Sequence, residues 1–442
     1  MTPVPADPLD QLPLKYASTI RRMLEAALDS VDPEKCVSRF IVKNPDLFSG
    51  KEYQLIAIGK AAAAMSRGAV AVLGKLVKGG IIVTKYPPDQ DLDPQFEIIL
   101  SGHPNPNQMS IEASKQIQRF VEVCEPQQQI ICLISGGGSA LVVQPIEGIT
   151  LEDYAGVNQA LLDHHLPIEA VNTIRKSLDQ FKGGGLAEWM DGKAAITLIL
   201  SDVVSNILEQ VASGPTFPVK NRSITAIQLL RRYRLVQKID PKVFKILRKN
   251  AKFEAEKQND HSGSRPKPVP TFAVGDLEIA KQAAKLIGTR DGYDMVIHKQ
   301  PLRCSVENAS KSICSVIRKE LNRKRFAIHI WGGEVTVHAA SKGSGGRNTH
   351  LALLVMDDMK EETGYGFISF ATDGDDGNSH SSGALVSSKT YTNSMQRCFN
   401  TEYYLNNYCS AELFEQLGAL IKTGPTGTNV NDLYIAILSN EI

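Results

Sequence analysis

No segment of the sequence approaches the roughly 18 consecutive apolar residues that a membrane-spanning helix needs. Residues 1–30 hold acidic residues and prolines in place of a basic region followed by an apolar run, so a secretory signal is not expected. We therefore expect a soluble protein without membrane contact.

The sequence also has no excess of positive or negative charge, and its cysteines show no disulfide or zinc-binding pattern. Lys and Arg total 49 against 48 for Asp and Glu, a formal net charge of +1, and such a chain has no long-range field that favours nucleic acid. The seven cysteines form no Cys-x-x-Cys pair and no zinc-finger spacing, and their odd number argues against a disulfide framework. These absences favour a cytoplasmic location and no nucleic-acid partner.

Four familiar catalytic or nucleotide-binding motifs are missing as well. The sequence has no Gly-x-x-x-x-Gly-Lys-Ser/Thr loop and no His-Arg-Asp followed by Asp-Phe-Gly. The Gly-x-Ser-x-Gly elbow of hydrolases fails at Leu141, and no Gly-x-Gly-x-x-Gly is followed by an acidic residue about 20 positions later. P-loop ATPases, protein kinases, α/β-hydrolases and dinucleotide-dependent dehydrogenases are therefore disfavoured.

What the sequence does contain is an alternation of short apolar strands and helices. Apolar residues at helical spacing over 14–28 predict an amphipathic surface helix. Continuous apolar strands separated by helices indicate a mostly parallel sheet that is covered on both faces. The strands of this first lobe are predicted at 55–58, 80–84, 97–100, 130–134 and 194–200.

A polar stretch at 252–270, with three closely spaced prolines, is the best candidate for a linker. Strands resume after it and predict a second, mixed sheet, with strands at 271–274, 295–298, 326–331, 335–338, 367–371 and 433–438. We expect two Rossmann-like α/β lobes, an N-terminal domain over 1–265 and a C-terminal domain over 266–442.

Several predicted strands run into loops made of glycine plus Ser, Asp, Lys or Arg. In an open α/β sheet, ligands bind beyond the carboxyl ends of the strands, where bare amides can meet an anion. Loops of this kind in such number suggest one shared phosphate site, and they lie at 58–60, 135–139, 201–202 with 213–216, 343–348, 372–374 and 423–429.

The clearest of these loops has three successive glycines, which let the backbone approach a ligand and expose consecutive N–H donors as an anion nest. It consists of Ser135, Gly136, Gly137, Gly138 and Ser139. Taken alone, this triglycine is equally well explained as a flexible turn needed for packing.

Two cationic residues stand in the loops. Lys60, at the end of the first strand, can extend a mobile charge toward phosphate oxygens, although a lone surface lysine is the simpler interpretation. Arg347 is surrounded by glycines, and its planar fork suits a carboxylate or a phosphoryl group; Asn348 adds a neutral donor. The basic runs at 231–234 and 322–325 are interpreted as solvated helix faces.

Carboxylates also stand at predicted strand ends. Asp202 and Asp373 can hold Mg²⁺ that bridges nucleotide phosphates, or orient an attacking hydroxyl. An ordinary Asp-Gly turn explains Asp373 equally well on its own. His103, at another strand end, can contact a ligand, whereas the adjacent pair at 164–165 points in directions about 100° apart on a helix and cannot share a metal.

Taken together, the loops resemble those of the glycerate kinases that carry a MOFRL C-terminal domain, a family long labelled hydroxypyruvate reductases. The resemblance spans nearly the whole chain, with the motifs in family order. They are 58–62, 102–104, 134–141, Asn172 with Arg175 and Lys176, 182–184, 200–203, 212–216 with Ser213, Gly214 and Thr216, 332–334, 345–348, 372–374, and 423–430 with Thr426 and Asn429.

The resemblance implies ATP-dependent phosphorylation of D-glycerate at its 2-hydroxyl to give 2-phosphoglycerate, with ATP and Mg²⁺ as cofactors and Lys60 and Arg347 as catalytic residues. It also implies that the active site lies in the cleft between the two α/β lobes. We hypothesise that Asp202 and Asp373 engage Mg²⁺ or the hydroxyl, because phosphoryl transfer asks a protein mainly for positioning and charge stabilisation. The 135–139 loop, with Ser213, Gly214 and Thr216, is assigned to phosphate. The substrate contacts are expected to be His103, Asn172, Arg175, Lys176, Asn348, Thr426 and Asn429, and a homodimer is compatible with this assignment.

Two segments depart from the family pattern. Ser205-Asn206-Ile207 stands where the family continues with a Gly-Asp pair, and Thr349-His350 replaces a Gln-Glu pair. If the missing acids serve the metal or the substrate, the alternatives are a kinase for a related small hydroxy acid or a catalytically degenerate paralogue that binds nucleotide or hydroxy acid. A hydroxypyruvate dehydrogenase is disfavoured because the dinucleotide fingerprint is missing.

Overall fold

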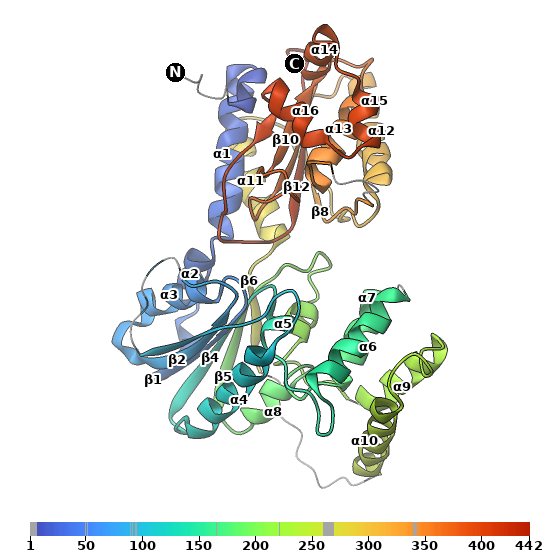
Figure 1. The fold of residues 1–442 in the computed structure, drawn as a ribbon. Coiled ribbons are helices and arrows are strands. Elements are labelled where there is room, and N and C mark those ends of the chain that lie inside the picture. The colour runs from blue at the N-terminus through green and yellow to red at the C-terminus, as the bar shows by residue number, and fades with distance from the viewer. Residues whose placement is uncertain are drawn as a thin grey trace. The chain divides into compact units, whose positions relative to one another are not determined.

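The structure is a computed structural model, and it describes residues 7–48, 50, 52–88, 90, 92, 95–164, 166–220, 222–259, 269–338 and 343–442. The chain divides into two compact units (Figure 1). The parallel-sheet unit comprises Pro33–Ser201 and Ile207–Val274, and the mixed-sheet unit comprises Met1–Asp32, Asp202–Asn206 and Gly275–Ile442.

The parallel-sheet unit is built on a six-stranded sheet with the order β3-β2-β1-β4-β5-β6, and the pairings among β1 to β5 are parallel. This is the strand order of doubly wound folds, in which the chain moves outward from β1 first on one side and then on the other. The strands are β1 (Glu52–Ile58), β2 (Val77–Thr84), β3 (Phe96–Leu100), β4 (Gln128–Ile134), β5 (Ala194–Leu200) and β6 (Thr271–Gly275).

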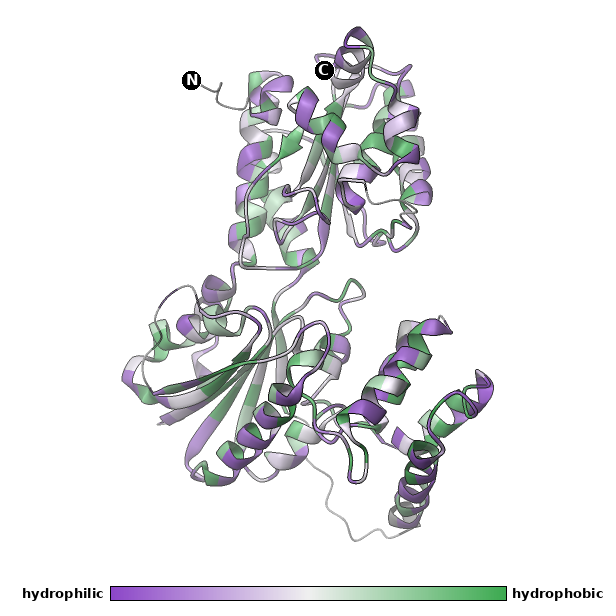
Figure 2. Cartoon of the chain, viewed as in Figure 1, coloured by the Kyte–Doolittle hydropathy of each residue, from purple (hydrophilic) through white to green (hydrophobic). Residues whose placement is uncertain are grey.

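The strands of this unit are apolar and their inner residues are buried, as expected for a parallel sheet covered by helices (Figure 2). The helices are α2 (Pro33–Lys43), α3 (Ala62–Leu73), α4 (Gln108–Val123), α5 (Gly138–Leu141), α6 (Leu151–Asp163), α7 (Ile168–Ser177), α8 (Gly185–Trp189), α9 (Arg222–Arg232) and α10 (Pro241–Asn259). Helices α6, α7, α9 and α10 share a separate hydrophobic cluster.

All five strands predicted for the first lobe are confirmed. The structure differs at 271–274, which was expected in the second lobe: as β6, this segment extends the first sheet beyond β5, and the amide of Thr197 donates to the carbonyl of Pro270 over 2.8 Å. The expected linker at 252–270 is helical up to Asn259; its continuation over 260–268 lies outside the described residues. Local composition does not reveal which sheet a strand will join.

The mixed-sheet unit has a six-stranded sheet with the order β11-β10-β9-β12-β8-β7. β7 pairs with β8 in parallel, and the pairings of β12 with β8 and β9, and of β10 with β9 and β11, are antiparallel. The strands are β7 (Met295–Ile297), β8 (Ile328–Gly333), β9 (Tyr365–Ala371), β10 (Gly383–Ser387), β11 (Leu420–Ile421) and β12 (Asp432–Leu438). The expectation of a mixed sheet is confirmed.

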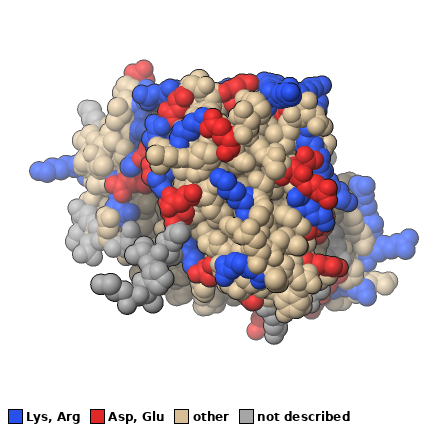
Figure 3. Space-filling view, turned by 90° about the horizontal axis from the view of Figure 1, so that it is seen from above, with Lys and Arg blue, Asp and Glu red and all other residues tan. Residues whose placement is uncertain are grey.

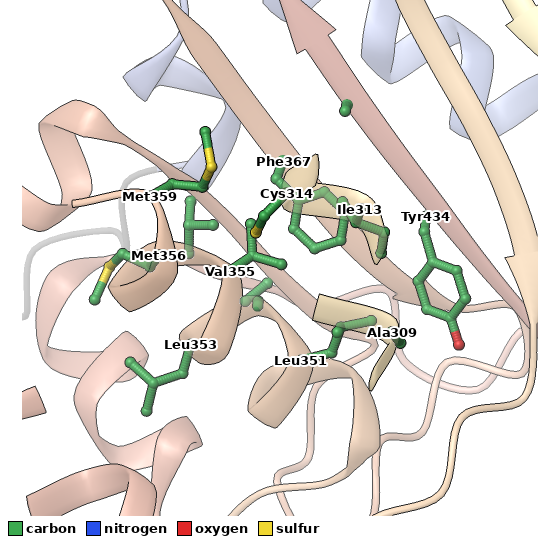
Figure 4. Packing of buried hydrophobic residues seen from close by; sticks show 14 of the residues in the cluster. Ala309, Ile313, Cys314, Leu351, Leu353, Val355, Met356, Met359, Phe367 and Tyr434 are labelled. Carbon is green, nitrogen blue, oxygen red and sulfur yellow. The ribbon is translucent and has the colours of Figure 1, made fainter. Parts of the chain in front are cut away.

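The helices of this unit are α1 (Leu14–Ser30), α11 (Leu277–Arg290), α12 (Val306–Asn322), α13 (Arg347–Asp358), α14 (Ser388–Gln396), α15 (Thr401–Asn406) and α16 (Ser410–Leu417). Its core lies where α12 and α13 pack on the sheet, and Figure 4 shows Leu351 and Val355 of α13, and Met359 just after it, beside Ile313 of α12 and Phe367 of β9.

The predicted amphipathic helix is confirmed as α1, which buries Ile20, Met23 and Ala27. It packs on α11, and the Thr19 hydroxyl donates to the carboxylate of Asp291 over 2.6 Å. The start of the chain therefore belongs to the mixed-sheet unit, which differs from the continuous division expected at 265–266.

One strand predicted for this unit is not found in the structure. The strand predicted at 335–338 is not formed in this described segment, where only Thr336 makes an isolated bridge, with Ser305.

No helix in the described part of the chain is long and apolar enough to cross a membrane. On the face shown in Figure 3, acidic and basic side chains are interspersed.

Candidate active site

The carboxyl ends of β1 and β4 mark the point where the parallel sheet changes winding direction, which is where doubly wound folds bind their ligands. Ile58, the last residue of β1, is in register with Ile134, the last residue of β4. The loops that follow are joined: the amide of Lys60 donates to the carbonyl of Gly136 over 3.0 Å, and the amide of Ala61 donates to Oγ of Ser135 over 3.1 Å. The first two predicted phosphate loops therefore meet.

The triglycine loop offers unused donors at this junction. The amides of Gly136, Gly137 and Gly138 donate to no acceptor among the residues that the structure describes. Gly137 adopts φ +89°, a left-handed conformation that other residues adopt only with strain. Consecutive amides without an acceptor make a concavity that binds anions.

Lys60 and His103 flank the triglycine loop. A Cβ atom on Gly137 would lie 3.1 Å from Cδ2 of His103 and 3.4 Å from Cγ of Lys60, while the Lys60 side chain as a whole is exposed. Burial, followed by the charges of Lys60 and Lys85, lowers the pKa of His103, so this histidine is neutral near pH 7. Its buried Nδ1 has no hydrogen-bond partner among the described residues.

The far side of the loop contacts the 212–216 segment. Oγ of Ser139 lies 2.8 Å from Oγ of Ser213, and a Cβ atom on Gly138 would lie 2.6 Å from Cβ of Ala212. Ala212 and Ser213 both have positive φ angles (50° and 62°), which is strained for residues with side chains. Strained backbone of this kind concentrates at ligand-binding sites, and here it brings Ser213 to the triglycine loop.

Of the remaining predicted residues of this unit, some lie at or near the 209–216 segment and one, Arg175, points away from it. Thr216 is buried and its Oγ1 has no partner among the described residues, and the carbonyl of Gly214 accepts from the amide of Gly184 over 2.9 Å. On α7, Nζ of Lys176 donates to the carbonyl of Glu209 over 3.2 Å, whereas Nε of Arg175 donates to Asn158 over 2.7 Å. Lys176 thus approaches the 209–216 segment, and Arg175 is directed to α6.

On the same helix, Asn172 is partly buried. Burial lowers the pKa of Lys176, with Glu209 acting against it and Arg222 with it. A partly dehydrated ammonium next to the 209–216 segment is available for an anionic ligand.

A second group of predicted residues gathers in the mixed-sheet unit, where β8 and β9 end and β12 begins. The register places Asp432, the first residue of β12, opposite Gly333 of β8 on one side and Ala371 of β9 on the other. Asp432 is completely buried. Asp432 was not among the predicted site residues, because it lies two positions beyond the family motif at 423–430.

Arg347 begins α13 and is paired with Asp432. Its Nε lies 2.6 Å from Oδ2 and its Nη2 lies 3.0 Å from Oδ1, while Nη1 lies 3.5 Å from the exposed carboxylate of Glu334. Burial alone would lower the pKa of Arg347, but the charge and hydrogen bonds of Asp432, aided by Glu334, raise it. The planar fork of Arg347 is therefore bound in bidentate fashion by a carboxylate of the protein itself, and its contact with a substrate carboxylate or phosphoryl group stays a prediction.

The loops at 372–374 and 423–429 also meet. Nδ2 of Asn429 donates to Oδ2 of Asp373 over 3.1 Å, and the hydroxyl of Thr426 donates to the carbonyl of Thr372 over 2.6 Å. Gly374 has φ +84°, and a Cβ atom there would lie 2.0 Å from the carbonyl oxygen of Gly424. This contact requires glycine and brings Asp373 and Asn429 together.

Asp202 follows β5 but belongs to the mixed-sheet unit. Its carbonyl accepts from Nδ2 of Asn431, the neighbour of Asp432, over 2.9 Å. Two residues of the predicted catalytic and metal-binding set, Asp202 and Asp373, are therefore tied to the same 429–432 segment.

Of the residues that depart from the family pattern, Asn206, Thr349 and His350 have structural partners, whereas the buried Oγ of Ser205 has no hydrogen-bond partner among the described residues. Asn206 donates to the carboxylate of Asp276, the N-cap of α11, over 2.8 Å. The amide and hydroxyl of Thr349 both donate to the buried Asp376 carboxylate over 2.8 Å, and the ring of His350 stacks on Tyr408. These side chains contribute to local packing at the start of α11 and of α13.

Asn348 lies in the buried interior next to these residues. Its amide donates to Asp376 over 2.8 Å and its Oδ1 accepts from the Ser369 hydroxyl over 2.7 Å, while Nδ2 has no partner among the described residues. Asp376 thus holds the first turn of α13 in place. Asp376 shares the acidic loop of Asp373, but only Asp373 was predicted as a metal ligand, because an Asp-Gly sequence is typical of an ordinary turn.

The carboxylates of the mixed-sheet unit can be compared with the ligands that Mg²⁺ requires. Among the described residues, no three or more His, Cys, Asp or Glu side chains are grouped to hold a metal ion. Mg²⁺ that arrives with a nucleotide needs only one or two carboxylates, since phosphates and water supply the other ligands. Among the described residues, the Asp373 carboxylate accepts from the backbone amide of Asp375 and from the side-chain amide of Asn429, both over 3.1 Å, so it keeps lone pairs for a cation.

Comparison with known proteins shows two family matches along the chain. A family described as a domain of unknown function, DUF4147, matches residues 19–248, and the MOFRL family matches 327–432. The D-glycerate 2-kinase of Thermotoga maritima is 32% identical over 421 residues, which cover 94% of this chain and 97% of that protein.

A putative hydroxypyruvate reductase of Agrobacterium vitis is 32% identical over 420 residues, covering 94% of this chain and 92% of that protein. Among solved structures, the crystal structure of a glycerate kinase of Thermotoga maritima is similar with a TM-score of 0.86 at 30% identity. The similarity covers 96% of this chain and all of that one.

Proposed function

This chain belongs to the glycerate 2-kinase family with DUF4147 and MOFRL domains, and we propose that it transfers the γ-phosphoryl group of ATP to the 2-hydroxyl of D-glycerate. The products are ADP and 2-phosphoglycerate. Both compact units contribute residues to this proposal.

The observation that carries the proposal is the triglycine loop. The amides of Gly136, Gly137 and Gly138 have no acceptor among the described residues, and the side chain of Lys60 passes beside Gly137. Phosphate oxygens would accept from these amides, and the mobile ammonium of Lys60 would follow charge as it moves between phosphates. Phosphoryl transfer needs little covalent chemistry from the protein beyond such positioning and charge stabilisation.

In the mixed-sheet unit, Arg347 supplies a second cation and Asp373 a carboxylate. Asp373 and Asp202 would hold Mg²⁺ that enters with the nucleotide, which neutralises phosphate charge. Burial raises the pKa of Asp373, while the amide of Asp375 acts against this shift, so a cation nearby favours its ionised form. His103, neutral and beside Gly137, is placed as a hydrogen-bonding group rather than a charged one.

A catalytically degenerate paralogue is the alternative suggested by the two departures from the family pattern. The contacts of Asn206, Thr349 and His350 argue against it, because these side chains serve helix caps and packing in this chain. Lys60, Arg347 and the triglycine loop are all retained. A kinase for a related small hydroxy acid uses the same machinery and differs only in the acceptor.

The test is ADP release by the purified full chain with ATP, Mg²⁺ and D-glycerate, followed by identification of the phosphorylated carbon in the product by ³¹P–¹H NMR. We expect 2-phosphoglycerate. L-glycerate and other small hydroxy acids in parallel reactions test the acceptor, and a thermal shift with ATP but no ADP release with any acceptor would favour the degenerate paralogue.

A separate reaction with hydroxypyruvate and NADH tests the reductase label of the Agrobacterium vitis relative. We expect no NADH oxidation, because the sequence carries no dinucleotide fingerprint. Oxidation of NADH at a rate above that of the kinase reaction would contradict the proposal.

A further inference from the structure

The carboxylate of Asp432 is the group that fixes the orientation of Arg347, and its contacts exceed what an ordinary ion pair needs. Oδ2 accepts from Nε of Arg347 over 2.6 Å and from the hydroxyl of Tyr434 over 3.2 Å, and Oδ1 accepts from Nη2 over 3.0 Å. Asp432 is completely buried, whereas 29% of the Arg347 side chain is exposed. The pair therefore has a buried end and an end that faces solvent.

Asp432 itself cannot move easily. It begins β12 between two strands, opposite Gly333 and Ala371. Burial, followed by the charge of Asp432, raises the pKa of Tyr434 well above its ordinary value, so the tyrosine hydroxyl stays protonated and donates to the carboxylate. Side chains locked by packing and by further hydrogen bonds hold a functional group to the tolerance that catalysis requires.

The backbone of Arg347 is fixed as well. The amides of the next two residues, Asn348 and Thr349, donate to the buried carboxylate of Asp376, each over 2.8 Å. The guanidinium is planar with five donors in a rigid fork. Once Nε and Nη2 are bound to Asp432, the direction of Nη1 is determined, and Nη1 lies on the side of the exposed Glu334, 3.5 Å from its carboxylate.

We propose that Asp432, supported by Tyr434, is a positioning residue that turns the Nη1 edge of Arg347 outward to receive an anionic oxygen of the substrate or of the transferring phosphoryl group. Glu334, 51% exposed, is the carboxylate that such an anion replaces at Nη1. This inference rests on the proposed kinase function for the nature of the anion. The orientation of Arg347 by Asp432 does not depend on it.

The kinetic test uses Asp432→Asn, which keeps the shape of the side chain and removes its charge. We expect kcat, calculated per folded protein, to fall about 10²-fold, the scale of losing one oriented charge-stabilising group. The KM for ATP should stay within about twofold, as for an interaction that is made only in the transition state. The matched control is Asp294→Asn, which removes the carboxylate from the exposed Arg325–Asp294 pair and should leave kcat unchanged. A folded Asp432→Asn with unchanged kcat overturns the proposal.

If Asp432→Asn does not fold, Tyr434→Phe tests whether Asp432 positions Arg347, because this variant removes only the hydroxyl that donates to Asp432. We expect kcat to fall about threefold to tenfold, the range of one ordinary hydrogen bond, again without a change in the KM for ATP. Unchanged kcat in this variant overturns the proposal.

A second readout separates this inference from the proposed function. The ¹⁵Nε–¹H NMR signal of Arg347, assigned by its loss in Arg347→Lys, should be protected from solvent exchange in the wild type and exposed in Asp432→Asn. In Tyr434→Phe we expect faster exchange than in the wild type. If the wild type releases no ADP but shows this protection, the kinase proposal fails and the orientation of Arg347 stands; if the signal exchanges freely in the wild type, the orientation by Asp432 is wrong.

Discussion

The backbone of Gly137 lies against the imidazole of His103, such that a Cβ atom on Gly137 would come within 3.1 Å of Cδ2 and 3.3 Å of Nε2. The contact joins the loop after β4 to the loop after β3, beyond the carboxyl ends of these strands of the parallel sheet. It leaves room for glycine alone at the centre of the proposed phosphate nest.

Gly137→Ala should therefore weaken nucleotide binding. The left-handed φ of +89° adds about 1–2 kcal/mol of strain for a residue with a Cβ atom, and the methyl group must displace His103. We expect a raised KM for ATP and a lowered Tm. Gly156→Ala, on α6 with no atom near its Cβ position, is the control and should keep both values or raise the Tm slightly; equal effects in the two variants would contradict the nest.

Lys60→Met should lower kcat by about 10²- to 10³-fold, because a charge-stabilising donor next to the transferring group is lost. The side chain is exposed, so the Tm should not change. Activity is measured by ADP release at saturating ATP and glycerate. Lys75→Met removes an equally exposed lysine after α3 and should be neutral; a Lys60→Met enzyme with wild-type kcat would remove Lys60 from the catalytic set.

Asp179→Asn should destabilise the protein strongly. Asp179 and Lys182 form an ion pair with both side chains fully buried, and Nζ of Lys182 also donates to the carbonyl of Val142 over 3.0 Å. Breaking such a pair by removing one charge costs about 3–5 kcal/mol. Urea unfolding measures the loss, and Glu441→Gln, which breaks the exposed Lys15–Glu441 pair, should cost less than about 1 kcal/mol.

Stability should fall in acid partly through His298. Burial, followed by the charges of His329 and Lys281, lowers the pKa of His298 to about 4, so from about pH 6.5 down to pH 4 the unfolded chain binds a proton that the folded chain does not. The free energy of unfolding therefore decreases as the pH falls through this window, by about 1–3 kcal/mol.

His298→Gln should flatten this part of the profile when unfolding is followed by urea titration at several pH values. Nε2 of His298 lies 3.0 Å from Nδ1 of His329, and its ring stacks on Trp331, so some loss of stability at pH 7 is expected as well. His164→Gln, at the exposed end of α6, should leave the pH profile unchanged. A wild-type slope in His298→Gln would show that other groups cause the acid sensitivity.

Much of the fold could be predicted because the strands are short, continuous and apolar. Residues 194–200 were predicted as a strand and form β5 with the same bounds, and the helix over 14–28 is α1. The strand expected at 335–338 failed because alternation of apolar and polar residues is also satisfied by an extended loop with a single bridge at Thr336. β11, with two residues, is too short for a periodic signal, and β10 was not predicted although it has five residues, as many as β3.

The candidate residues show the same division. Glycines followed by Ser, Lys or Arg identified the loops at 58–60, 135–139 and 343–348, because such composition is unusual after a strand. Asp432 was missed because it begins a strand, and the structural role of Asp376 was not predicted because it follows an Asp-Gly turn; neither position is unusual in sequence. Their burial and their bonds to the start of α13 exist only after distant segments have packed.

By itself, the sequence determined the alternation of strands and helices, the glycine loops at their ends and the supply of donors, because these depend on local backbone preference and on hydrophobic patterning. Only the tertiary structure decided that β6 joins the first sheet, that α1 packs on α11, and that Asp432 holds the guanidinium of Arg347. Those outcomes depend on pairing between residues far apart in the chain, where register and burial rather than local composition set which atoms meet.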